Sequence, residues 1–95
     1  MVDFTKRVSV PAHVMFRQLS GESILLNLNN EQYFGLDDIG TQMWILLSQS
    51  GSIELAYRDL IQEYQVDPDQ LRCDLAELVQ SLSEQGLVDI VDAAA

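Results

Sequence analysis

The residue types that commonly carry out catalysis or hold metals are sparse in this chain. His13 is the single histidine and Cys73 is the single cysteine, and they stand far apart in the sequence. A transition-metal site needs three or four converging ligands, so this pair does not suggest one. Cys73 is instead expected to be a small, buried or half-buried hydrophobic residue on a helix.

Other catalytic and cofactor-binding motifs are also missing from the sequence. Carboxylates are plentiful, but most fall where solvated helix faces are expected, and the five glycines are scattered at expected turns and helix ends. That scatter leaves no glycine-rich phosphate loop. We therefore expect no catalytic residue, no metal site and no cofactor, and we predict that the chain is not an enzyme. Its function should lie in the surfaces that its elements offer.

The net charge of the chain makes some classes of binding partner less favourable than others. Fifteen acidic residues against five basic ones give a formal net charge of −10. Nucleic-acid binders gain non-specific affinity from lysine and arginine, so this charge disfavours nucleic acids, and it disfavours anionic membranes too. A neutral or partly basic partner is favoured. No apolar run approaches the roughly 20 residues of a transmembrane helix, and residues 1–20 lack a secretory signal, so we expect a cytoplasmic protein.

The N-terminal part of the sequence predicts a small antiparallel sheet. Three segments have the residue types of strands, namely Val14–Leu19, Ile24–Leu28 and Gln32–Leu36. Ser20-Gly21 predicts the first turn. Asn29-Asn30 predicts a tight hairpin turn, because asparagine tolerates positive φ. The first 36 residues therefore predict a three-stranded meander.

The two ends of the chain are expected to contribute less. Residues 1–7 show no apolar period and are expected to fray, and Val8–Val10 predicts a short strand that Pro11 stops. Leu87–Val91 predicts a short terminal strand, and Ala93–Ala95 is expected to be loose. We expect a single domain over residues 1–95, with an ordered core from about residue 8 to about residue 91.

The apolar period changes to that of helices after the third strand. Asp37 or Asp38 is suited to cap a first helix, which contains the only tryptophan, Trp44. Gly51 is expected to end this helix. Ser52 is expected to cap a second one.

The third helix has the clearest start signal in the chain. Asp67 is a good N-cap, Pro68 suits the first helical position, and Gln70 stands where a capping box places its reciprocal donor. The helix should run to about Gln85, with Gly86 as its C-terminal cap. Strands followed by three helices predict an α+β fold, a winged helix-turn-helix-like domain.

An ordered set of residues resembles the PqqD-like family. The set comprises Gly21-Glu22-Ser23-Ile24-Leu25-Leu26-Asn27, Tyr33-Phe34-Gly35-Leu36-Asp37, Gly40, Trp44, Leu71-Arg72-Cys73-Asp74-Leu75, Leu78, Leu82 and Gly86-Leu87. The resemblance implies three strands followed by three helices. It also implies that the chain binds the leader of a ribosomally made precursor peptide as a strand beside its own third strand, clamped by the third helix.

Within that family the chain resembles the freestanding recognition elements of lasso-peptide clusters. The segment Leu26-Asn27-Leu28-Asn29-Asn30-Glu31-Gln32-Tyr33-Phe34-Gly35-Leu36 favours this subtype. The resemblance implies a leader peptidase and an ATP-dependent cyclase as partners.

The residues themselves favour the same kind of site. A third strand that ends a meander leaves backbone groups unpaired, and a leader strand could pair with them while pockets on the third helix give selectivity. The candidate peptide-binding residues are Gln32, Tyr33, Phe34, Gly35, Leu36, Leu71, Asp74, Leu75, Leu78 and Val79.

Each candidate residue also has a simpler interpretation. The leucines of the third helix could be ordinary core, and Tyr33 could be a surface aromatic. Asp74 could pair with Arg72 or with a leader side chain, or it could be an ordinary exposed acid on a helix. The runner-up to leader binding is the same fold used as a generic adaptor, or as a chaperone of the pyrroloquinoline-quinone type that presents a peptide to a radical SAM enzyme. A DNA-binding regulator ranks below these, because the third helix is acidic. The sequence leaves open whether two copies associate.

Overall fold

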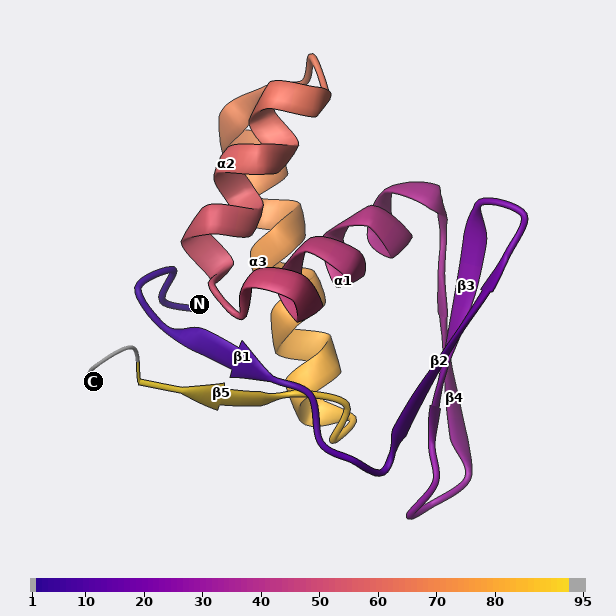
Figure 1. Cartoon of the computed structure of the whole chain (residues 1–95). Helices are drawn as coiled ribbons and strands as arrows, with labels where there is room; N and C mark the ends of the chain where they lie inside the picture. Colours follow the sequence, from indigo (N-terminus) through magenta and orange to yellow (C-terminus); the bar gives the residue numbers. More distant parts are fainter. Residues whose placement is uncertain (1, 93–95) are drawn as a thin grey trace.

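The computed structural model describes residues 2–92, and the expected loose segment Ala93–Ala95 lies outside them. Five strands and three helices follow one another along the chain (Figure 1). Their bounds are β1 Arg7–Ser9, β2 Val14–Leu19, β3 Glu22–Asn27, β4 Gln32–Leu36, α1 Asp38–Ser50, α2 Ile53–Glu63, α3 Pro68–Glu84 and β5 Asp89–Val91. The predicted α+β fold, with a three-stranded antiparallel sheet followed by three helices, is confirmed.

The strands form two separate sheets. β2, β3 and β4 make the predicted antiparallel meander, in the order β2-β3-β4, while β1 pairs with β5. In Figure 1 the meander stands to one side, and α1 leads from it back to α2 and α3. The predicted short strands at the two ends of the chain therefore pair with each other and do not extend the meander.

One face of the meander packs on the helices. Residues in a strand alternate between faces, and the buried residues of β3 are Ser23, Leu25 and Asn27. Phe16 on β2 and Phe34 on β4 lie directly across from Leu25, and so share its face. The phenyl ring of Phe16 stacks on the indole of Trp44 in α1, with ring centroids 6.1 Å apart. Trp44 is itself buried and belongs to the core.

The hairpin between β3 and β4 differs from the predicted tight Asn29-Asn30 turn. Its loop has four residues, 28–31, and closes on the pair Asn27 and Gln32. The left-handed backbone conformation falls on Glu31, with φ of 59°, and on neither turn asparagine. Two asparagine side chains accept hydrogen bonds within the loop instead: Asn27 Oδ1 accepts from the Asn29 amide and Asn30 Oδ1 accepts from the Gln32 amide, each at 3.0 Å. These local hydrogen bonds stabilise the four-residue loop in place of the predicted two-residue turn.

The helix ends follow the predicted signals closely. Asp37 caps α1, Ser52 caps α2 and Asp67 caps α3, each by accepting a hydrogen bond from a backbone amide of the first turn. α3 ends in a Schellman motif in which Gly86 has φ of 72° and the Leu87 amide donates to the Leu82 carbonyl at 2.8 Å. The predicted reciprocal bond of Gln70 is not formed, because its side chain donates to Asp74 instead.

The expectation that residues 1–7 fray is wrong for residues 2–7, the part of this segment that the structure describes. Val2 and Phe4 are buried in the core. The Phe4 ring meets Tyr57 edge-on at 5.5 Å, and the Arg72 guanidinium lies 4.1 Å from the centroid of the Phe4 ring. The segment has no periodic pattern because it packs as an irregular strap across α2 and α3, which periodicity cannot detect. Within residues 2–92, no helix is long and apolar enough to cross a membrane.

Candidate functional site

The outer edge of β4 has no strand partner among residues 2–92. β4 pairs with β3 along one edge, from the Ser23–Leu36 pair to the Asn27–Gln32 pair, and no described strand lies along the other. Alternate residues of such a strand direct their N–H and C=O groups away from the sheet. β4 therefore offers a ladder of hydrogen-bonding groups to an incoming extended chain.

A groove of about 490 Å³ begins beside this edge. Three elements contribute to it: the end of β4, the first two turns of α1 and the middle of α3. The lining residues are Phe34, Gly35, Leu36, Asp37, Ile39, Gly40, Met43, Asp74 and Leu78. Most of them are apolar or glycine, and the two charged members are both aspartates.

A glycine stands where α1 comes close to the end of β4. Gly40 is buried in the first turn of α1, and a Cβ atom there would lie 3.1 Å from Asp37 Oδ1 and 3.3 Å from a methyl carbon of Leu36. The Asp37 oxygen is itself held at 2.7 Å by the Gly40 amide that it caps. The missing side chain therefore lets α1 begin tightly against the end of the strand and close one wall of the groove.

The walls of the groove that β4 and α3 form present half-buried apolar side chains. Phe34 points to the helix side of the sheet and packs against the edge of the core, and Leu78 does the same from α3. Ile39, in the first turn of α1, remains 40% exposed. An apolar side chain entering here would be covered on several sides.

The structure brings only part of the predicted site to this groove. Phe34, Gly35 and Leu36 of β4, together with Asp74 and Leu78 of α3, line it. These five residues come from the two elements that the sequence singled out. Their role in binding stays a prediction.

The remaining predicted residues lie elsewhere. Tyr33 is on the face of β4 turned away from the helices and is 74% exposed, and Gln32 is exposed beside the hairpin loop. Leu71, Leu75 and Val79 belong to the core and are at most 4% exposed. Those three side chains match their simpler interpretation as core residues.

Four groove residues were not among the predicted site residues. They are Asp37, Ile39, Gly40 and Met43, and all come from the start of α1. Their position in the sequence, directly after β4, could have predicted their place in the groove. A helix that follows an edge strand without a loop must begin next to that edge. Of the two apolar side chains among these four residues, Met43 is buried and Ile39 is exposed.

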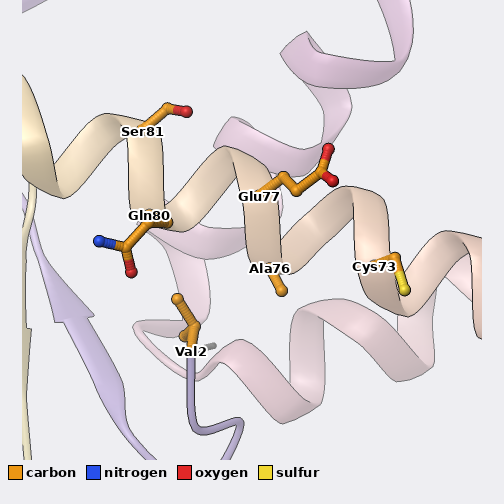
Figure 2. A pocket seen from close by; sticks show the side chains of 6 residues that line it. All are labelled: Val2, Cys73, Ala76, Glu77, Gln80 and Ser81. Carbon is orange, nitrogen blue, oxygen red and sulfur yellow. The ribbon is translucent and has the colours of Figure 1, made fainter.

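A second hollow lies on a different face of α3. It measures about 410 Å³ and is lined by Val2 and by residues of α3 that include Cys73 and Glu77 (Figure 2). Cys73 is exposed there, so the expectation of a buried or half-buried cysteine is wrong. Its thiol points away from the core because Leu71, Leu75 and Val79 already fill the buried side of the helix. No group of three potential metal ligands occurs within residues 2–92.

Comparison with known proteins matches the chain to a family. Residues 22–88, from the start of β3 to the residue before β5, match the family described as coenzyme PQQ synthesis protein D (PqqD). The chain belongs to the PqqD family. The resemblance drawn from the sequence is thereby confirmed. No curated protein matches the chain by sequence.

Two solved structures are similar to this PqqD-family chain. One is described as TbiB1 in complex with the TbiA(beta) leader peptide; it is 28% identical, covers 90% of this chain and 96% of its own, and superimposes with a TM-score of 0.78. The other is described as lasso peptide synthetase B1 complexed with the leader peptide, at 24% identity, 87% and 98% coverage and a TM-score of 0.77. The second likeness establishes the fold alone.

Proposed function

We propose that this chain binds the leader region of a ribosomally synthesised precursor peptide and does not itself catalyse a reaction. The leader adds as a strand to the free edge of β4 and lies against α3. The observation that carries the proposal is the position of the groove, which begins at the one edge of β4 that no described strand covers. The likeness to TbiB1, solved with the TbiA(beta) leader peptide, supports it.

Strand addition suits this site for a physical reason. Main-chain hydrogen bonds along β4 supply affinity that does not depend on the leader's sequence, while the groove selects alternate side chains. Interfaces of this kind lie near the low end of standard size, about 1,200 Å², and ordering a flexible leader costs free energy. We expect a dissociation constant on the order of 0.01–10 μM, about −7 to −11 kcal/mol.

We further propose that the pathway is of the lasso-peptide type. The partners are then a leader peptidase and an ATP-dependent cyclase, to which the chain delivers the precursor. Binding contributes by raising the local concentration of precursor beside these enzymes, an effect set by the geometry of the assembly. We place the proteins of this pathway, including this chain, in the cytoplasm.

A second candidate has one observation in its favour. The family match over residues 22–88 is to a protein of coenzyme PQQ synthesis, which favours a chaperone that presents a peptide to a radical SAM enzyme. Both candidates require the same peptide-binding edge. Pull-down of the peptidase or of a radical SAM enzyme with the peptide-loaded chain separates them.

The first test places a charge in the groove. Leu78→Glu should weaken binding of the labelled cognate leader at least about tenfold, roughly 1.4 kcal/mol, because a carboxylate would replace the apolar surface that the leader covers. Fluorescence anisotropy measures the affinity, and circular dichroism checks the fold. Ile39→Glu should act similarly, and it should leave the fold intact, since an acidic residue in the first turn of a helix is favourable.

The matched control is Leu55→Glu, the same change at an exposed leucine of α2. It should bind the leader as the wild type does. A titration with duplex DNA at physiological salt should show no binding. Unchanged leader affinity in both groove variants, or DNA binding that falls steeply with salt, would contradict the proposal.

A further inference from the structure

Asp74 brings a negative charge to the α3 wall of the groove. Its Oδ1 atom accepts a hydrogen bond from the Gln70 side-chain amide at 2.9 Å, one turn earlier on the same helix. A neutral amide orients the carboxylate but does not balance its charge. Within residues 2–92, the only side chain that hydrogen-bonds to this carboxylate is therefore an uncharged one.

The arginine closest in sequence is held away from Asp74. Arg72 stands two residues earlier, and residues two apart on a helix do not face each other. Its guanidinium lies 4.1 Å from the centroid of the Phe4 ring and 5.4 Å from that of Tyr57. The alternative in which Asp74 pairs with Arg72 is therefore wrong.

No other cation of the described chain fills that place. Within residues 2–92 the ion pairs are Lys6 with Asp92 and Arg58 with Glu54, and none of these four residues lines the groove. The second groove carboxylate, Asp37, sits at the N-terminus of α1, where the helix dipole offsets part of its charge. Asp74 lies in the interior of α3, where no helix terminus compensates it.

The spacing of Asp74 and Leu78 matches an extended ligand. The two residues are one turn apart on α3, roughly 6 Å along the axis at 1.5 Å per residue. Side chains two apart in a strand lie on the same face, roughly 6.7 Å from each other. A strand that runs along α3 therefore places one side chain against Leu78 and the side chain two residues away against Asp74.

We propose that the leader bound in this groove carries an apolar side chain followed or preceded, two residues away, by a lysine or arginine that pairs with Asp74. The inference rests on the proposed function and deepens it by naming the class of peptide. Charge complementarity agrees, because a cationic segment is drawn to a chain of net charge −10. Asp74 then selects among peptides that the β4 edge alone would accept equally.

The test selects ligands from a displayed library of random peptides of about 12 residues, which span roughly 40 Å when extended. The wild type is compared with Asp74→Asn, which keeps the size of the side chain and an oxygen that accepts from Gln70. Glu77→Gln is the matched control, because Glu77 lies on the same helix but lines the other hollow (Figure 2). We expect lysine or arginine two residues from an apolar residue to be enriched with the wild type and with Glu77→Gln, and not with Asp74→Asn.

One selected peptide then gives the size of the effect. Replacing its lysine by glutamine should weaken binding to the wild type about two- to fivefold, the range of a solvent-accessible ion pair, and should leave binding to Asp74→Asn almost unchanged. The difference should shrink when NaCl rises from about 0.05 M to about 0.5 M, because salt screens the pair.

The outcomes separate this inference from the function on which it rests. Selected peptides without enrichment of basic residues, or with the same enrichment for Asp74→Asn, would overturn the role of Asp74 and leave leader binding standing. Failure of the wild type to select any peptide, together with failure to bind the cognate leader, would overturn both.

Discussion

Residues that the sequence presents as equivalent have different roles in the structure. Leu71, Leu75, Leu78 and Leu82 form one stripe along α3, yet only Leu78 reaches the groove. The reason is angular: at about 100° per residue, Leu78 is the leucine of the stripe nearest to Asp74 around the helix, about 40° away. The edge of an apolar stripe that borders a charged residue is therefore where ligand contacts should be sought first.

A buried hydroxyl pair joins the sheet to the first helix. Ser23 Oγ on β3 lies 2.7 Å from Thr41 Oγ1 on α1, and both residues are at most 2% exposed. Thr41→Val should lower the free energy of unfolding by about 1–3 kcal/mol, because it leaves the Ser23 hydroxyl buried without a partner. The measurement is urea denaturation followed by circular dichroism.

The double variant Ser23→Ala with Thr41→Val tests the explanation. It removes both hydroxyl groups, so its cost should be less than the sum of the two single changes. Strictly additive costs would show that the two hydroxyl groups do not depend on each other.

At the scale of elements, the end of β4 and the start of α1 line the groove together. The chain passes from β4 into α1 through Asp37 alone, so the helix begins against the strand that it follows. The two remaining strands, β1 and β5, pair with each other away from the meander. This pairing leaves β4 free at the edge where the groove begins.

Strand addition predicts a period of two along the ligand. Methylating the backbone nitrogen of one leader residue at a time should weaken binding at every second position, where the N–H points toward β4. Each such loss should be at least about 1 kcal/mol, roughly fivefold, from the hydrogen bond alone. Isothermal titration calorimetry of the methylated series measures it, and the intervening positions serve as internal controls. A period near 3.6, or equal losses at every position, would contradict a bound strand.

At the scale of the whole molecule, the acidic charge of the chain bears on its stability. Neither α2 nor α3 has a basic residue in its last turn, and each ends on a glutamate, Glu63 and Glu84 respectively. A negative charge at a helix C-terminus interacts unfavourably with the helix dipole. Repulsion within a chain of net charge −10 adds to this cost.

Neutralising these two glutamates should stabilise the protein. Glu63→Gln and Glu84→Gln should each raise the free energy of unfolding by about 0.3–1 kcal/mol, and together they should raise the melting temperature by several degrees. The rise in melting temperature on adding salt should be smaller for the double variant than for the wild type. Glu54→Gln, in the first turn of α2, is the control and should lower stability. Equal melting temperatures for all variants would show that these charges do not matter.

The sequence by itself determined the elements and their ends. Local chemistry fixed the caps at Asp37, Ser52 and Asp67 and the Schellman glycine, Gly86, because each acts within a few residues of the chain. It also indicated the family, and it singled out the strand and the helix that contribute residues to the groove. The hairpin loop was mispredicted because its left-handed residue is Glu31, a type that gives no turn signal.

Only the tertiary structure decided which surfaces remain free. Two of these decisions are contacts between residues far apart in the chain: Phe4 packs under Arg72, and β1 pairs with β5. A third is a difference between residues of one type, because Leu78 is half-buried while the other leucines of its stripe are buried. Burial is a property of all the packed elements at once, so no local pattern encodes it. For the same reason, the sequence could not show that Arg72 lies over the Phe4 ring and so does not pair with Asp74.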